Sequence, residues 1–166
     1  IAPRVHNRTD WKRDNWVDDM VHQLRNQSHF RWFDSGDMYS VKLARKILEV
    51  MRMTPDVKHW LPTRMHKFLK FESVINSMNA LPNVCVRFSS DEIDGSVIPG
   101  RFTSVIYDPE RPEQLDNATV CEAYTREGKC EDCRACWNRD INVIAYPQHG
   151  KKMEKVKRLL SLQVKS

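Results

Sequence analysis

The positions of the cysteines constrain this chain more than any other feature. Four of the five cysteines follow the spacing C-x8-C-x2-C-x2-C, at Cys121, Cys130, Cys133 and Cys136. The last three resemble the run that holds three corners of a cubane iron–sulfur cluster. A mononuclear zinc site more often takes its ligands as two separated pairs. The spacing predicts one shared inorganic site with a 4Fe-4S cluster as the first interpretation; zinc is the alternative, and disulfides or unligated thiols stay open.

The composition predicts a folded chain, and we expect residues 1–166 to form a single domain. The length is that of one ordinary domain, and 40% of the residues are hydrophobic. No apolar run is long enough to span a membrane, and the first residues lack the apolar stretch of a signal peptide. We therefore expect a soluble protein inside a cell, where clustered cysteines bind metals more often than they form disulfides. The chain begins at Ile1 rather than methionine, so we also expect residues upstream of it.

The net charge of +5 belongs to the end of the chain. Residues 151–166 carry six basic residues and one acidic residue, whereas residues 1–150 carry 21 of each and balance to zero. The pattern predicts a basic C-terminal helix over 151–164. Its lysines are typical of a solvated helix face, and contact with nucleic-acid phosphates is the alternative.

Alternating helical and extended patterns predict the fold class. Apolar residues at helical spacing indicate an N-terminal helix over 11–27, with Asp10 as its N-cap, and a second helix that begins behind Ser40. The core over 28–149 adds a third helix over 68–78 and five apolar strands at 29–33, 57–61, 84–88, 103–107 and 142–146. Strands that alternate with helices favour right-handed βαβ units. We predict an α/β fold with a mainly parallel sheet of about five strands and flanking helices, as an open sheet or an incomplete TIM-like barrel.

Polar residues follow several of the predicted strands. Ligands bind beyond the carboxyl ends of parallel strands, so these residues and the cysteine loop over 121–137 are predicted to surround a common pocket. The candidates are Asp37, Arg64, Ser89, Asp91 and His149. Asp37 also fits a turn with a helix cap, Arg64 a surface ion pair, and His149 an ordinary loop histidine.

The fifth cysteine and the tryptophan after the last clustered cysteine have structural interpretations. Cys85 lies within an apolar strand and is predicted to be a small buried side chain rather than a ligand. Trp137 directly follows the last cysteine, and we expect it to fill the core or to shield the metal site from water.

Four segments together resemble a known family. They are FRWFDSGD at 30–37, TPDVKHWLPTR at 54–64, VRFSS at 86–90 and GKCEDCRACW at 128–137. In this order they are similar to an uncharacterised phage-encoded family related to the gene product 88 domain, over about residues 28–149, with the cysteine block as the most specific part. The resemblance implies a viral protein in the cytoplasm of an infected bacterium. It also implies that Asp37 and Arg64 occupy motif positions, and it names no reaction.

Three functions are consistent with these features. The first is a phage-type iron–sulfur accessory protein with a redox or regulatory role, because a cluster with four cysteine ligands leaves no iron open to substrate. Its partner would be a host protein or an electron-transfer protein. The second is a nucleic-acid-binding module with a zinc-stabilised loop and the basic C-terminal helix. The third is an enzyme whose catalytic candidates are Asp37, Arg64, Ser89 and Asp91.

Overall fold

The structure is a computed structural model that describes residues 9–33, 36–90, 97–98, 102–115, 117–127 and 129–148. The predicted helix over 151–164, Asp91 and His149 lie outside these residues. The helices are α2 (Trp16–Leu24), α3 (Val41–Met53) and α4 (Glu72–Ala80), and the strands are β1 (His29–Arg31), β2 (Lys58–Thr63), β3 (Val84–Ser89), β4 (Thr103–Tyr107), β5 (Thr119–Val120) and β6 (Val143–Pro147). Short 3-10 turns occur at Met65–Lys67, Leu69–Phe71, Pro112–Gln114, Ala123–Arg126 and Ala135–Trp137.

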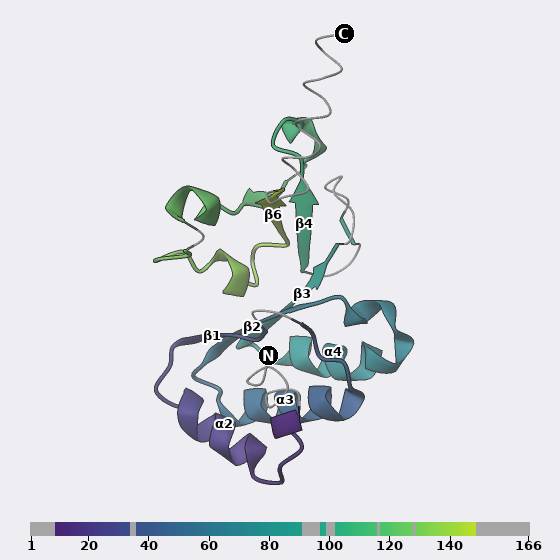
Figure 1. Cartoon of the computed structure of the whole chain (residues 1–166), viewed down its shortest axis with the longest axis vertical. Helices are drawn as coiled ribbons and strands as arrows, with labels where there is room; N and C mark the ends of the chain where they lie inside the picture. Colours follow the sequence, from purple (N-terminus) through teal and green to yellow (C-terminus); the bar gives the residue numbers. More distant parts are fainter. Residues whose placement is uncertain are drawn as a thin grey trace.

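The six strands form one parallel sheet in the order β1-β2-β3-β4-β6-β5. The sheet is open and curls strongly into a half-barrel (Figure 1). The predicted α/β class, parallel sheet and flanking helices are therefore confirmed. The sixth strand, Thr119–Val120, was not predicted, because two residues are too short to leave an alternating pattern in the sequence.

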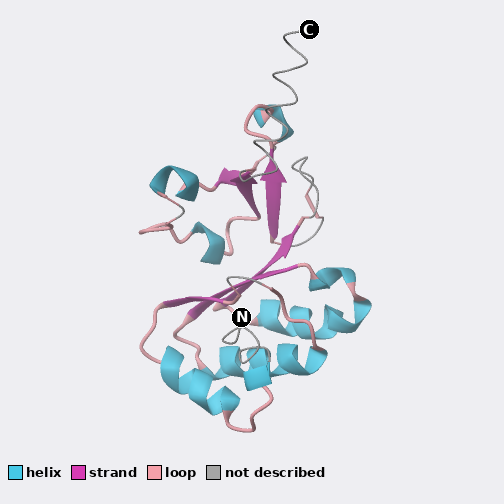
Figure 2. Ribbon diagram, viewed as in Figure 1, coloured by secondary structure: helices cyan, strands magenta, loops and turns pink. Residues whose placement is uncertain are grey.

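The helices cover the half of the sheet that contains β1, β2 and β3 (Figure 2). Helix α3 turns Ile47 and its neighbours at helical spacing toward this core, where they are fully buried. Strands β2 and β3 contribute Leu61, Val84 and Val86 from the opposite side of the same cluster. Burial of these apolar side chains holds the helices against this face of the sheet. In the part of the chain that the structure describes, no helix is long and apolar enough to cross a membrane.

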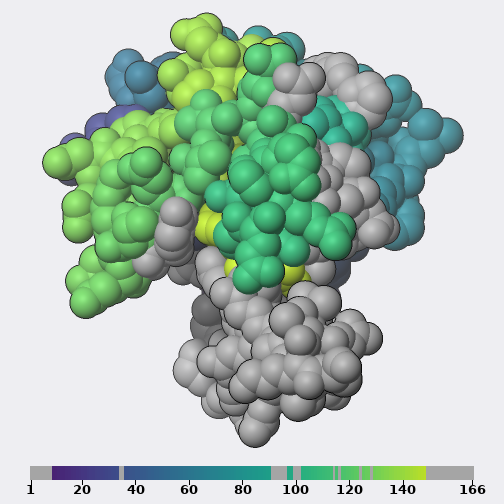
Figure 3. Space-filling view, turned by 90° about the horizontal axis from the view of Figure 1, so that it is seen from above, coloured from purple at the N-terminus to yellow at the C-terminus, as the bar shows by residue number. Residues whose placement is uncertain are grey.

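The other face of β2 and β3 is covered by the segment that links β5 to β6. Neighbouring residues of a strand point to opposite faces, so Trp60, Cys85 and Arg87 face away from the helices. Trp60 packs against this linking segment, and Arg87 is hydrogen-bonded to it. Cys85 is fully buried, as predicted. In Figure 3 the side chains of the linking segment, in light green, form one continuous part of the surface.

The start of the first helix differs from the prediction. Helix α2 begins after Asn15, and residues 11–15 form turns. Asp10 is not its N-cap, because its carboxylate pairs with the guanidinium of Arg13 at 2.6 Å. Ser40 precedes α3 as predicted, but its side chain makes no capping hydrogen bond.

The observed bounds of two other elements also differ from the predicted ones. Strand β1 ends at Arg31, ahead of Phe33, whose φ of 58° is incompatible with an extended strand. Gly36 follows with φ 88°, a conformation that side chains disfavour, so the predicted turn here requires a glycine. The third helix begins at Glu72 because two 3-10 turns occupy residues 65–71.

Candidate metal centre

The segment between β5 and β6 carries the four clustered cysteines. Cys121 directly follows β5, and its N–H donates to the carbonyl of Ala145 at 2.8 Å, which continues the pairing with β6. The left-handed residues Glu127 (φ 55°) and Glu131 (φ 49°) change the direction of the chain on both sides of Cys130. A tight turn follows, in which the N–H of Cys133 donates to the carbonyl of Cys130 at 2.9 Å. The local turns thus bring cysteines that are separated in sequence back toward Cys121.

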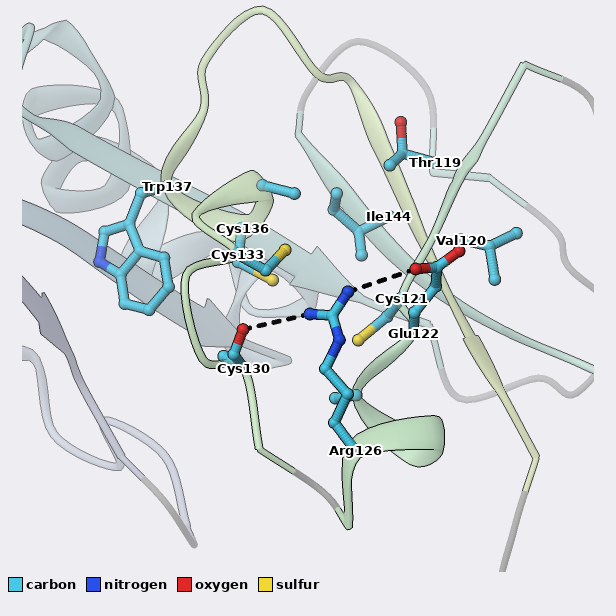
Figure 4. Close-up of a pocket in the computed structure, with 12 residues that line it drawn as sticks. Thr119, Val120, Cys121, Glu122, Arg126, Cys130, Cys133, Cys136, Trp137 and Ile144 are labelled. Carbon is cyan, nitrogen blue, oxygen red and sulfur yellow. Dashed lines mark hydrogen bonds and ion pairs between the residues drawn. The ribbon is translucent and has the colours of Figure 1, made fainter.

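All four cysteines line one cavity of about 260 Å³ (Figure 4). The other lining residues are Thr119, Val120, Glu122, Ala123, Arg126, Ala135, Trp137 and Ile144. Cys85 is not among them, and all five cysteines are free thiols. The structure therefore brings together the four cysteines that the spacing singled out, and it leaves out the fifth.

The cavity is not a preassembled metal site. Among the described residues, no three His, Cys, Asp or Glu side chains are arranged to hold an ion. The guanidinium of Arg126 instead lies between Cys121 and the other cysteines, where it donates to the carbonyl of Cys130 and to the carboxylate of Glu122, each at 3.3 Å (Figure 4). The thiols fit a metal centre by their chemistry and common cavity. Binding would have to draw the sulfur atoms together and displace Arg126, as in sites where metal binding is coupled to folding.

Cys136 lies at the buried end of the cavity, whereas Cys133 is exposed. Burial raises the pKa of Cys136 to about 11, so without a cation its side chain is a thiol at neutral pH. Its Sγ lies 3.0 Å from the hydroxyl of Tyr146. Burial also raises the pKa of Tyr146, so the phenol keeps its proton and is able to donate to a Cys136 thiolate. A bound cation would favour that thiolate.

Aromatic side chains close one wall of the cavity. The indole N–H of Trp137 donates to the carbonyl of Phe30 at 3.0 Å, and its ring packs edge-on against Trp60 with centroids 5.1 Å apart. Within the described residues the indole nitrogen of Trp60 is buried and has no hydrogen-bond partner. Trp137 thus packs beside β2, as expected of a core residue, and it also lines the cavity.

Arg87 is a residue of this region that the sequence analysis missed. Its side chain has no exposed surface, and its Nε donates to the carbonyl of Cys136 at 2.8 Å. The signal was present in the sequence, because Arg87 interrupts the apolar run of strand β3. An arginine there needs buried acceptors on the face of the sheet away from the helices.

Asp37 is hydrogen-bonded to the end of β2 and to the residue that follows this strand. Its Oδ1 accepts hydrogen bonds from the N–H of Met38 at 2.8 Å and the hydroxyl of Thr63 at 2.7 Å. Its Oδ2 accepts one from the main-chain N–H of Arg64 at 2.7 Å. These contacts tie the segment after β1 to the end of β2, which agrees with the turn interpretation of Asp37.

The predicted common pocket does not form from the described candidates. None of Asp37, Arg64 and Ser89 lines the cysteine cavity. The physical reason is the alternation of β2: Thr63, which holds Asp37, points to the same face as Leu61 in the helix-covered core, while the cysteine segment packs against Trp60 on the other face. Asp91 and His149 lie outside the described residues.

The chain matches the model of a known protein family. The family described as Gene product 88 matches residues 2–139, which is most of the chain and includes the four cysteines of the cavity. No curated protein and no solved structure matches the chain significantly.

Proposed function

The chain belongs to the gene product 88 family, and from this premise we propose that it is an iron–sulfur protein with a redox or regulatory role. Cys121, Cys130, Cys133 and Cys136 would hold a 4Fe-4S cluster. The observation that carries the proposal is that these four thiols, from the end of β5 and from the following turns, line one cavity. When bound, such a cluster supplies one-electron chemistry, and four cysteine ligands leave no iron open to substrate.

The spacing of the cysteines favours a cluster over a single ion. A zinc site more often takes its ligands as two separated pairs. The C-x2-C-x2-C run also supplies three ligands from one short stretch, which is more typical of a cluster than of zinc.

The side chains around the cysteines have distinct tasks in this proposal. The hydroxyl of Tyr146, 3.0 Å from the sulfur of Cys136, would donate a hydrogen bond to the ligand thiolate, and Trp137 and Ile144 would exclude water from the buried wall. Cys133 is exposed, so the shortest route for an electron to reach a partner leads through this side of the site.

The setting follows from the phage-encoded proteins that the sequence resembles. We place the protein in the cytoplasm of an infected bacterium, with a host protein or an electron-transfer protein as its partner. The enzyme hypothesis receives less support, because both oxygens of the Asp37 carboxylate are engaged in hydrogen bonds that hold the fold together. The nucleic-acid hypothesis depends on residues 151–164, which lie outside the described part of the chain.

The decisive experiment is metal analysis of protein purified without oxygen. We expect about four irons and about four labile sulfides per chain, with a broad absorption band near about 400 nm, as for a cubane cluster. One zinc per chain in a colourless protein would overturn the proposal and make the cysteine segment a structural zinc site.

A pair of cysteine variants makes this test specific. Cys133→Ala removes a ligand and is expected to abolish most of the bound iron and sulfide and to destabilise the segment around it. Cys85→Ala is the matched control, since Cys85 is buried outside the cavity, and it should keep the full metal content. Equal metal content and equal melting in the wild type and Cys133→Ala would exclude the assigned ligand set.

A further inference from the structure

Arg87 is the largest fully buried side chain of the described residues. All three nitrogens of its guanidinium donate to main-chain carbonyls. The acceptors are Cys136 (2.8 Å), Asn138 (2.8 Å), Ile141 (2.9 Å), Ala135 (3.3 Å) and Asn142 (3.4 Å). A single side chain of β3 thus donates to five carbonyls of one short stretch. Three of these carbonyls, those of Ala135, Asn138 and Asn142, also accept a hydrogen bond from a main-chain N–H.

These acceptors all lie in residues 135–142, the stretch that begins beside Cys136 and leads into β6. The guanidinium of Arg87 therefore holds the main chain of Cys136 in place relative to β3. Because the donors of arginine have a rigid planar arrangement, a shift of this stretch would break several hydrogen bonds at once.

The charge of Arg87 is not balanced by its hydrogen-bond partners. All its acceptors are neutral carbonyls, and among the described residues no carboxylate forms an ion pair with it. A buried cation without an anion is costly, and such groups are normally paired. Four thiolates bring more negative charge than an iron–sulfide core brings positive charge, so the loaded cavity would be an anion next to Arg87.

We infer that Arg87 is the positioning residue of the cysteine site and the buried positive charge that raises the reduction potential of its cluster. This inference rests on the proposed iron–sulfur function. Reduction adds an electron to the cluster, and a nearby cation stabilises the more negative, reduced form. Arg87 acts through the main chain of Cys136 and through its charge.

Arg139 provides a matched control in the same region. Its guanidinium lies 5.4 Å from the ring centroid of Phe102, and that of Arg87 lies 5.6 Å from the same ring. Arg139 also donates to main-chain carbonyls, those of Asn79, Leu81 and Val84. None of these acceptors belongs to the cysteine segment, so loss of Arg139 should weaken packing without removing a charge held against Cys136.

The test compares Arg87→Gln, Arg87→Lys and Arg139→Gln with the wild type, each loaded with iron and sulfide without oxygen. For Arg87→Gln we expect a lower potential, equivalent to about a tenfold smaller reduction equilibrium constant, or about 59 mV for a one-electron couple. Arg87→Lys keeps the charge but loses the fork, so its potential should stay near that of the wild type while its melting temperature falls. The potential of Arg139→Gln should not change.

The outcomes separate the two proposals. A wild-type protein that takes up no iron and sulfide overturns the iron–sulfur function and, with it, this role of Arg87. A loaded Arg87→Gln protein with an unchanged potential, or an equal shift in Arg139→Gln, overturns the role of Arg87 alone.

A measurement on the wild type covers the case in which Arg87→Gln does not fold. The Nε–H of Arg87 should exchange slowly with solvent, and its nuclear magnetic resonance signal should shift and broaden when the cluster is loaded. The signal of Arg139 is the reference. Equal perturbation of the two signals, or none, would overturn the inference.

Discussion

The two faces of the sheet at β2 and β3 are covered in different ways. On one face, α2, α3 and α4 bury a large apolar cluster that includes Ile47, Leu61 and Val86. On the other, a segment of short turns packs only Cys136 and a few apolar groups against Trp60, and it is held by hydrogen bonds from Arg87. The first face is stabilised by burial of apolar surface, and the second depends on polar contacts and, in our proposal, on a metal cluster.

This contrast shows that the two faces of one sheet are held by different kinds of contact. The helix-covered core is built from apolar side chains of the chain itself. The cysteine segment is joined to it through the sheet and through side chains such as Arg87 and Trp137. If the segment binds a cluster, loss of the cluster should therefore loosen the segment and leave the helix-covered core in place.

The largest effect is expected from a cavity in the helix-covered core. Ile47 is fully buried on α3, and Ile47→Ala should lower the free energy of unfolding by about 2–5 kcal/mol, because it removes apolar contacts and leaves a void. Urea unfolding followed by circular dichroism measures the loss, and the exposed residue Arg45 gives the control Arg45→Ala, expected to stay within about 0.5 kcal/mol.

The effect of Ile47→Ala should not depend on the cysteine segment. The loss caused by Ile47→Ala should be the same in cluster-loaded and chelator-treated protein, because the core and the cysteine segment lie on opposite faces. A loss that appears only in the loaded protein would show that the two faces are not independent.

The next effect concerns His59, a buried histidine on the helix-covered face of β2. The indole N–H of Trp32 donates to its Nδ1 at 3.1 Å, which assigns the proton to Nε2, and Nε2 lies 2.8 Å from the hydroxyl of Thr54. That hydroxyl donates to the carbonyl of Val50 at 2.7 Å. Protonation of Nδ1 would break the contact with Trp32, and burial lowers the pKa of His59 to about 4.

The lowered pKa of His59 predicts acid sensitivity. The unfolded chain binds a proton at this histidine below about pH 6.5, whereas the folded protein resists until about pH 4. Stability should therefore fall as the pH drops through this window, by about 3 kcal/mol, and then level off. Urea titrations at several pH values should show that the free energy of unfolding of His59→Gln depends less on pH than that of the wild type. An identical pH dependence in the variant would contradict the assignment.

A smaller loss is expected for Asp37→Asn. The change replaces one acceptor oxygen with an amide that faces a main-chain N–H, and it removes the charge from the remaining hydrogen bonds. We expect a cost of about 1–3 kcal/mol in the free energy of unfolding, with iron and sulfide content unchanged. Full stability together with loss of a redox or other activity would instead assign Asp37 a functional role.

The smallest effect is expected for Tyr146→Phe. The hydroxyl of Tyr146 contacts the sulfur of Cys136, so its removal should cost about 1 kcal/mol in stability. In the loaded protein it should lower the reduction potential, because hydrogen bonds to cluster sulfurs raise it. A potential equal to that of the wild type would show that this hydroxyl does not bond a ligand sulfur.

The sequence predicted the part of the fold that local patterns encode. The helical spacing of Leu43, Ala44 and Ile47 and the apolar run from Val84 to Phe88 were sufficient for α3 and β3. The C-x8-C-x2-C-x2-C spacing likewise predicted which cysteines share a cavity. Each of these signals lies within a stretch of fewer than about 20 residues, the range over which periodicity and spacing are informative.

The remaining features depend on contacts between distant segments. Arg87 bonds carbonyls 48 to 55 positions further along the chain, and Trp137 bonds Phe30 across 107 positions. No local pattern encodes such partners. The curl of the sheet and the alternation of β2 also separated Asp37 from the cysteines, although both follow strands.

Amide hydrogen exchange on protein before and after removal of its metal by a chelator tests the division between the two faces most directly. We predict that protection is lost in residues 121–142 and retained in α3, β2 and β3, because in our proposal only the cysteine segment binds the cluster. Unchanged exchange in residues 121–142, or an equal loss throughout the helix-covered core, would contradict the account.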